Sequence, residues 1–392
     1  MGSAGFLVAS TVTPIVGAQL SGQPALAGIP TAFYWTGGAL ATLIWGRLMD
    51  PIGRRRTLSL GLLVGVFGAT LASYFVVRQS FRGFVLGLVL MGAANSALQL
   101  ARFMAGEVHH KEERGRAIAT VVLGGTVGAV LGPALVAPMS LLAVSLGGPP
   151  LAGPYAASAV FFAIGILVVT ALLHPDPRDL GREVESASRV AISEARSVPQ
   201  ILRDREVRVA GLTMAISQLV MVMLMVITSL HMSHHHHALS SIAAVMSSHV
   251  FGMYAFSVVS GRLADRWGRG PLIRAGALVL VVACLTATLS TAVGPLAFAL
   301  FLLGLGWNFC YVGGSTLLSD RLSQGERART QSINDFVLTS LAGAGSALSG
   351  LVFSTVGYTI MGYVSAGVSL LLVGLSRYVK DGGPDRVLNP SG

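Results

Sequence analysis

Charged residues are scarce in this chain of 392 residues. Asp, Glu, Lys and Arg together make up 11% of it, against roughly 25% in an ordinary soluble domain. A soluble protein of this length could not cover its surface with so few charges, which excludes a soluble enzyme and a disordered protein. Cysteine is scarcer still: Cys284 and Cys310 both lie in apolar runs, so a disulfide framework is excluded as well.

Apolar residues and glycine take the place of the missing charges. Hydrophobic residues make up 53% of the chain, glycine contributes 48 residues, and the mean hydropathy is +0.70. Glycine is frequent in membrane helices, where it lets backbones approach closely. The composition therefore predicts an integral membrane protein.

Twelve segments are long and apolar enough to cross a bilayer, for which a helix needs about 20 mostly apolar residues. The first begins almost at Met1, so we expect no cleavable signal peptide. The twelve segments are 4–21, 29–48, 57–77, 84–105, 116–140, 153–173, 207–230, 238–260, 272–291, 295–318, 330–353 and 358–376.

Lysine and arginine gather in alternate loops. Of the 27 such residues, 24 follow even-numbered spans, whereas only Arg78 and Arg82 lie in a loop on the opposite side and Arg102 falls inside a span end. Positive residues mark cytoplasmic loops, so we expect both termini in the cytoplasm and the chain in a bacterial inner membrane. The net charge of +10 then reflects topology, and we expect no nucleic-acid partner.

One long polar stretch, 174–206, divides the spans into six and six. We expect an N-terminal six-helix bundle over 1–175, a cytoplasmic linker over 176–206, a C-terminal six-helix bundle over 207–376 and a cytoplasmic tail over 377–392. The charges of the linker partly follow helical spacing, which favours a connecting amphipathic helix over one that binds the membrane surface.

A short motif occurs twice, 215 residues apart: GRLMDPIGRRR at 46–56 and GRLADRWGRG at 261–270. Its first glycine allows close helix approach, its aspartate can cap a helix end and pair with an arginine one turn away, and its second glycine permits a sharp turn. Such a contact can be made and broken as two bundles rock, so we predict a gating role. The motif positions are Gly46, Asp50, Gly53 and Arg54 in the first copy, and Gly261, Asp265, Gly268 and Arg269 in the second.

This duplicated G-x-x-x-D-x-x-G-R motif resembles the loop signature of the major facilitator superfamily. The resemblance implies an all-α membrane fold of 12 transmembrane helices in two six-helix bundles, with the substrate site near the midplane between them. It implies a transporter and not an enzyme, with no cofactor, and with a transported ion or small molecule and the lipid bilayer as partners; we expect a monomer. The sequence has no G-x-x-x-x-G-K-[ST] motif, so we expect secondary or facilitated transport.

Methionine and histidine are concentrated around the seventh and eighth spans. Seven of the 13 methionines fall within 214–253, and six of the nine histidines fall within 231–249. Five of these histidines lie where the seventh span meets the outer loop, and we predict that they capture metal ions at the outer mouth. They are His231, His234, His235, His236 and His237.

Two residue pairs in these spans have the spacing of metal ligands. Met221 and Met225 lie one helical turn apart, and so do His249 and Met253. Thioether sulfur and imidazole suit Cu(I) above Zn(II) or the hard cations, and neutral methionine ligands need no buried carboxylate. Packing explains a methionine stripe in a membrane helix as well. From spacing alone, metal binding and packing both remain open.

The pairing of Met221-x-x-x-Met225 with His249-x-x-x-Met253 is similar to the CcoA-like branch of the superfamily, and so is GLGWNF at 304–309. That branch imports copper for the assembly of haem–copper oxidases, and it also contains riboflavin importers. The resemblance implies copper as the transported substrate and these four residues as its ligands. The histidine run at 234–237 is not part of the branch's pattern.

Other residues favour competing functions. Asp335 is the only carboxylate within the twelve spans, and it fits either coupling to a proton or a helix-dipole role. The Gly128-x-x-x-Gly132-Pro133 core looks like the antiporter motif of drug exporters, but Leu88 stands where their fourth-span arginine is expected. A metal-sensing receptor would need a soluble output domain, for which this sequence has no segment. An importer of a small organic molecule such as riboflavin would use polar or amphipathic groups in the cavity, and the candidates are Trp307, Asn308, Asn95 and Gln99.

Overall fold

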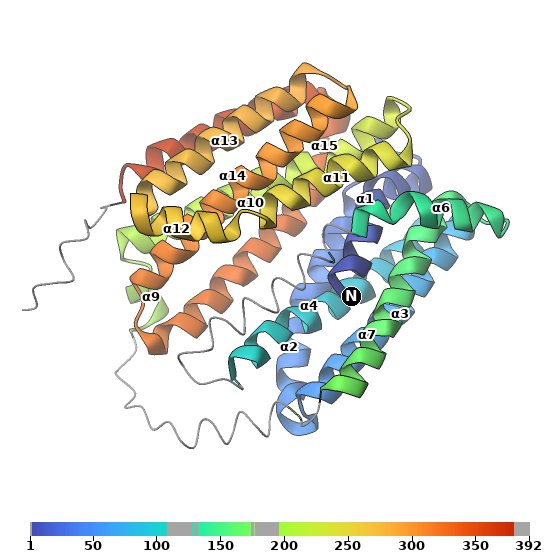
Figure 1. The fold of residues 1–392 in the computed structure, drawn as a ribbon, viewed down its shortest axis with the longest axis horizontal. Coiled ribbons are helices and arrows are strands. Elements are labelled where there is room, and N and C mark those ends of the chain that lie inside the picture. The colour runs from blue at the N-terminus through green and yellow to red at the C-terminus, as the bar shows by residue number, and fades with distance from the viewer. Residues whose placement is uncertain (1, 108–127, 129–131, 174–175, 177–195, 380–392) are drawn as a thin grey trace, which may run out of the picture. The chain divides into compact units, whose positions relative to one another are not determined.

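The computed structural model describes residues 2–107, 128, 132–173, 176 and 196–379, and every regular element in that part of the chain is a helix (Figure 1). Nine of its helical segments are long and apolar enough to cross a membrane. The last of the nine contains two of the predicted spans, and the second and fifth predicted spans are not among the nine. The all-α membrane fold predicted from the sequence is confirmed, and the predicted count of twelve is consistent with it.

The first half begins with four long helices whose ends lie within a few residues of the predicted spans. The fifth predicted span, 116–140, falls largely outside the described residues, and the helix described at its end continues to Ser145. The elements are α1 (Gly2–Ser21), η1 (Pro24–Leu26), α2 (Ile29–Ile52), α3 (Arg54–Val77), α4 (Phe81–Glu107), α6 (Val136–Ser145), η2 (Pro150–Ala152) and α7 (Gly153–Leu172).

The second half contains two features that the span pattern did not predict. The eighth span is broken at Ala255 and Phe256, and the eleventh and twelfth spans form one continuous element interrupted only at Gly357, which has φ 78° and ψ 173°. The elements are α9 (Val198–Ile201), α10 (Arg205–His234), α11 (Leu239–Tyr254), α12 (Ser257–Trp267), α13 (Arg269–Leu289), α14 (Val293–Asp320) and α15 (Gln324–Ser376).

The chain packs as two compact units that divide some helices between them. Unit 1 comprises Met1–Ala191, Val226–Ser247 and Ala342–Thr355, and unit 2 comprises Ile192–Met225, Ser248–Leu341 and Val356–Gly392. The predicted domain division at the polar stretch stays a prediction. The linker residues 177–195 and the tail residues 380–392 lie outside the described residues.

Polar side chains inside unit 1 are bonded to neighbouring helices. Tyr155 on α7 shares a hydrogen bond of 3.0 Å with Thr13 on α1, and the Trp45 indole on α2 donates to the Ala93 carbonyl on α4 at 2.7 Å. An unsatisfied polar group in the bilayer interior costs several kcal/mol, so such bonds fix the registry of α1, α2, α4 and α7. Unit 2 has its own apolar core around Met214, Ile273 and Leu317.

Candidate substrate site

The repeated motif folds into the same turn in both halves. Gly53 ends α2 and begins α3 with φ 91° and ψ 159°, and Gly268 ends α12 and begins α13 with φ 92° and ψ 167°. A positive φ of this kind is open to glycine and strained for residues with a Cβ. The sharp turn expected at both motif copies is present, while their gating role stays a prediction.

The arginine that follows each glycine donates a hydrogen bond to a backbone carbonyl near the end of the preceding helix. The Arg54 guanidinium donates to the Met49 carbonyl at 3.4 Å, and the Arg269 guanidinium donates to the Ala264 carbonyl at 2.9 Å. Both bonds reach five residues back along the chain, so the duplication extends to side-chain geometry. Nothing is described of the Asp50 side chain.

Acidic partners complete both turns. Asp265 lies 3.5 Å from Arg269, as the motif predicts, and Asp320 at the end of α14 accepts a hydrogen bond from Arg269 at 2.8 Å. In the first half, Asp176 accepts hydrogen bonds from the backbone N–H groups of Arg54 and Arg55 at 3.1 and 3.2 Å. A carboxylate at a helix N-terminus is favourable for the helix dipole. Asp176 and Asp320 were missed because neither lies within a motif copy.

His249 is fully buried on α11, and its ring has one bonded and one unbonded nitrogen. Its Nδ1 lies 2.9 Å from the Leu300 carbonyl on α14. A neutral imidazole next to a carbonyl oxygen carries its proton on that nitrogen, which leaves the lone pair on Nε2. Nε2 is buried and has no hydrogen-bond partner among the described residues. This is the usual preparation of a histidine that binds a metal through its second nitrogen.

The α11–α12 break lies directly after the His249–Met253 pair. Because α11 ends at Tyr254, the Met253 carbonyl is released from the helix ladder, and the Asn308 side-chain amide of α14 donates to it at 2.7 Å. Asn308 also bonds to the hydroxyls of Ser257 and Ser260. Asn308, predicted above as a cavity residue, is 3% exposed, and its hydrogen bonds stabilise this break.

The GLGWNF segment of α14 contacts both helices that carry the candidate ligands. A Cβ at Gly304 would lie 2.3 Å from the His249 carbonyl oxygen and 2.8 Å from the Met253 nitrogen, so α14 and α11 approach closely there. The Trp307 indole donates to the Gln218 amide oxygen on α10 at 2.9 Å. Gln218 belongs to the same face of α10 as Met221 and Met225. The Met221–Met225 helix and the His249–Met253 helix therefore both contact the GLGWNF segment of α14.

The methionine candidates differ in burial. Met221 is 4% and Met253 9% exposed, whereas Met225 is only half-buried. Within the described part of the chain, no three residues among His, Cys, Asp and Glu lie close enough to hold a metal ion together. A metal site in that part would depend on methionine sulfur.

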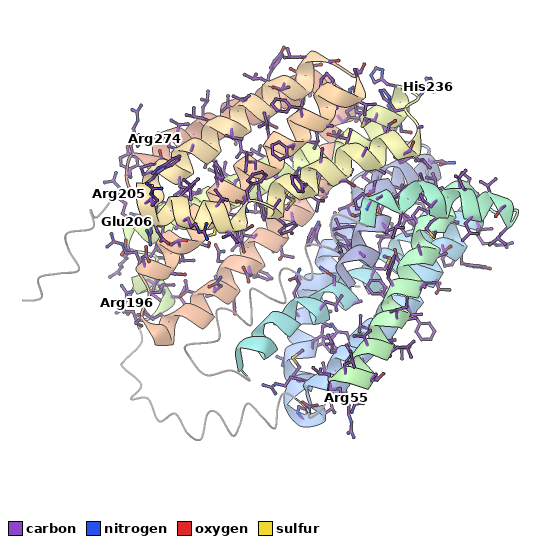
Figure 2. All side chains as sticks on the ribbon, in the orientation of Figure 1. Arg55, Arg196, Arg205, Glu206, His236 and Arg274 are labelled. Carbon is purple, nitrogen blue, oxygen red and sulfur yellow. The ribbon has the colours of Figure 1, made fainter. Side chains whose placement is uncertain are left out.

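The histidine run covers the end of α10 within unit 1. The rings of His231 and His235 lie 4.7 Å apart, and Phe353 packs against His231 and His234. His234, His235 and His236 are exposed, and His236 (labelled in Figure 2) has a φ of 58°. The structure thus brings two of these histidines together as a pair, and it gathers no third ligand from the residues described.

The remaining polar candidates lie on separate elements. Asp335 on α15 is half-buried, and its neighbour Asn334 contacts the Met214 sulfur at 3.7 Å. Asn95 and Gln99 lie on α4 in unit 1, the first half-buried and the second exposed.

An ion pair at the end of the linker was missed by the motif search. Arg196 binds both carboxylate oxygens of Glu326 at 2.8 and 2.9 Å, and Ser323 N–H donates to the same group at 2.9 Å. These hydrogen bonds stabilise the charged carboxylate and hold the pKa of Glu326 well below its usual range. The bond from the Arg196 side chain makes the largest contribution. Arg321, two residues before Ser323, pairs with Glu206 of α10. The S-x-x-E spacing of Ser323 and Glu326 was a detectable capping-box signal.

Unit 1 contains a buried tyrosine within a cluster of aromatic rings. The Tyr34 ring is 1% exposed and stacks on Phe6 at 4.5 Å, with Trp35 edge-on at 5.4 Å. The Tyr34 hydroxyl has no hydrogen-bond partner among the described residues. Tyr34 lines a small cavity together with Thr13 and Met91.

The membrane-length helices and the turn that occurs in both halves of the chain are those of a multi-pass membrane protein with an internal repeat. The chain belongs to the Major Facilitator Superfamily, whose model matches residues 1–224 and 210–391.

Relatives support this assignment along most of the chain, and a solved structure matches its fold. The chain is 32% identical over 376 residues to YdeG, an MFS-type transporter of Bacillus subtilis, covering 95% of this chain and 87% of that one. It is 29% identical over 370 residues to the riboflavin transporter RfnT of Brucella anthropi, covering 94% and 90%. The fold matches the xylose transporter XylE of E. coli with a TM-score of 0.68 at 12% identity, over 97% and 98% of the two chains.

Proposed function

We propose that this transporter imports copper as Cu(I) across the inner membrane by alternating access. The ligands in this proposal are Met221, Met225, His249 and Met253. The observation that carries it is the His249 ring, whose Nδ1 is bonded to the Leu300 carbonyl while the buried Nε2 has no partner among the described residues. A buried nitrogen lone pair is costly unless it binds something, and a soft cation is a fitting partner.

The surroundings of His249 also support the proposed binding of Cu(I). The Leu300 bond fixes the ring orientation and its tautomer, so little reorganisation is needed when an ion arrives. Methionine and neutral histidine bring no charge into the bilayer, where a buried carboxylate would be expensive. A monovalent ion held by neutral ligands also leaves readily when the site opens to the other side, as transport requires.

Copper accumulation in cells lacking their own copper uptake tests the proposal. We expect wild type to raise cell copper, and Met225→Ala to lower the uptake rate by about tenfold or more. Met223→Ala is the matched control, because Met223 is a half-buried methionine of the same helix on a different face. All variants are compared at equal membrane expression.

The histidine needs a variant that keeps its structural bond. His249→Asn retains an amide near the Nδ1 position to donate to Leu300, but removes Nε2. We expect it to fold and to lose uptake. If wild type leaves cell copper unchanged, copper import is ruled out. If His249→Asn transports copper normally, His249 is not a ligand of the ion.

A second candidate substrate is a planar organic molecule such as riboflavin. It is favoured by the similarity to RfnT and by the Phe6–Tyr34–Trp35 cluster, in which the unpartnered Tyr34 hydroxyl could bond a ring heteroatom. Under this alternative, the methionines of α10 are packing residues. Uptake of riboflavin by the wild-type chain, reduced by Tyr34→Phe and not by Met225→Ala, would decide in its favour.

A further inference from the structure

A pocket of about 410 Å³ opens in unit 2 between the first half of α10 and the end of α15. Its walls are mainly apolar, and its rim carries a charge and an aromatic ring. The lining residues are Ile216, Leu371, Gly374, Leu375, Arg377 and Tyr378. Leu371 is 60% exposed, so this pocket opens to the surface of the unit and not into its core.

Arginines surround the pocket. The Arg205 guanidinium lies over the Tyr378 ring, 3.8 Å from its centroid, which holds that charge at the rim. Arg208 follows at helical spacing on the same face of α10 that presents Ile216. Arg274 of α13 donates to the Ser376 hydroxyl at 3.3 Å, next to Arg377.

The described acids that form ion pairs do so with other arginines. Among the described residues, no carboxylate forms an ion pair with Arg205, Arg208 or Arg377. Glu206, which follows Arg205, pairs instead with Arg321. Figure 2 shows Arg205 and Arg274 toward the same end of the helices of unit 2.

We propose that this pocket binds one anionic phospholipid of the inner leaflet. The phosphate would lie among the arginines, and an acyl chain would lie against Ile216, Leu371 and Leu375. A zwitterionic lipid gains little from the charges, and free phosphate leaves the apolar walls without a partner. Basic pockets at the cytoplasmic side of membrane helices bind anionic headgroups, and the Lys/Arg distribution predicts that this end faces the cytoplasm.

The test uses the purified full chain in nanodiscs of phosphatidylcholine with increasing phosphatidylglycerol, with thermal unfolding as the readout. We expect phosphatidylglycerol to raise the unfolding temperature of wild type in a saturable way. Neutralising one arginine, as in Arg205→Gln or Arg377→Gln, should weaken the apparent affinity about fivefold. Arg82→Gln changes an exposed arginine in the first turn of α4, at the end predicted to face the other side, and should leave the affinity unchanged.

An uncharged variant separates the pocket from general surface charge. Gly374 lines the pocket, and a Cβ there would meet nothing within 4 Å. Gly374→Leu should therefore occupy part of the pocket and also weaken binding. Gly367→Leu is the control, since it has the same free space but does not line the pocket. Equal affinity of the arginine variants and wild type would overturn the proposal. So would an equal stabilisation by inorganic phosphate in phosphatidylcholine alone.

Discussion

Gly53 and Gly268 lie 215 positions apart in the sequence and adopt the same left-handed backbone conformation, with φ of 91° and 92°. Each ends one membrane helix and begins the next without an intervening loop residue. The two motif copies therefore encode one turn, used once in each half, and the conformation explains why glycine stands there.

Gly53→Ala should destabilise the protein. A φ of 91° with a ψ of 159° lies in a region that is essentially restricted to glycine and costs other residues about 1–3 kcal/mol. The new Cβ would also lie 2.5 Å from the Asp176 carboxylate. Gly46→Ala is the control, because a Cβ there meets nothing within 4 Å. We expect thermal unfolding in detergent to begin several degrees lower for Gly53→Ala only. Equal unfolding temperatures for the two variants would contradict this account.

Asn308→Ala should weaken the packing at the broken eighth span. The substitution leaves the Met253 carbonyl and the hydroxyls of Ser257 and Ser260 without their buried partner, at a cost of about 1–3 kcal/mol. Asn95→Ala removes a half-buried asparagine for which the described residues provide no hydrogen bond. Thermal unfolding should separate the two variants, and a drop of the same size in both would show that Asn308 has no special role.

The Arg196–Glu326 pair should make stability depend on pH on the acid side. The pKa of Glu326 is lowered in the folded protein, mainly by the Arg196 side chain, from an ordinary value of about 4.3. The stabilisation is therefore fully present above that ordinary pKa and is lost as the pH falls toward the lowered one. Glu326→Gln should unfold at a lower temperature than wild type at pH 7, and the difference should shrink at lower pH. A difference that stays constant with pH would argue against the ion pair.

The sequence predicted the spans and the repeat because those signals are local. A membrane helix needs a long apolar run wherever it lies, and the second glycine of each motif copy marks a turn by itself. The Met221–Met225 and His249–Met253 pairs were also visible as helical spacing. Asn308 was predicted only as a cavity residue, because the partners that it bonds at the α11–α12 break are set by tertiary packing.

What the sequence missed depends on contacts between distant segments. The sequence at Ala255 and Phe256 contains no proline that would predict a helix break. The break is stabilised by Asn308, which lies more than 50 residues further along the chain. The Leu300 carbonyl that fixes the His249 ring belongs to another helix, and backbone carbonyls carry no sequence signature. The pairing of Arg196 with Glu326 spans 130 residues and follows only from the fold.

The histidine run should affect the capture of copper and not its passage, if copper is the substrate. His234, His235 and His236 are exposed at the end of α10. Replacing His234 to His237 by alanine should raise the half-saturating copper concentration, by up to about tenfold, and leave the maximal uptake rate unchanged. Ser240→Ala, also exposed, is the control. A lower maximal rate would instead assign the run to the transport path.

Gly304→Ala tests whether the close approach of α14 to α11 holds the candidate ligands in place. The new Cβ would lie 2.3 Å from the His249 carbonyl oxygen, which is backbone and cannot rotate away, so the two helices must separate. Gly294→Ala on the same helix meets nothing within 4 Å and should behave as wild type.

If His249 and Met253 bind the transported ion, moving α11 should abolish uptake even in Gly304→Ala protein that is inserted normally. The comparison uses copper uptake per amount of folded protein, determined by size-exclusion chromatography in detergent. Normal uptake by folded Gly304→Ala would mean that α11 can move without loss of transport. The site would then not be confined to the face of α11 that carries His249.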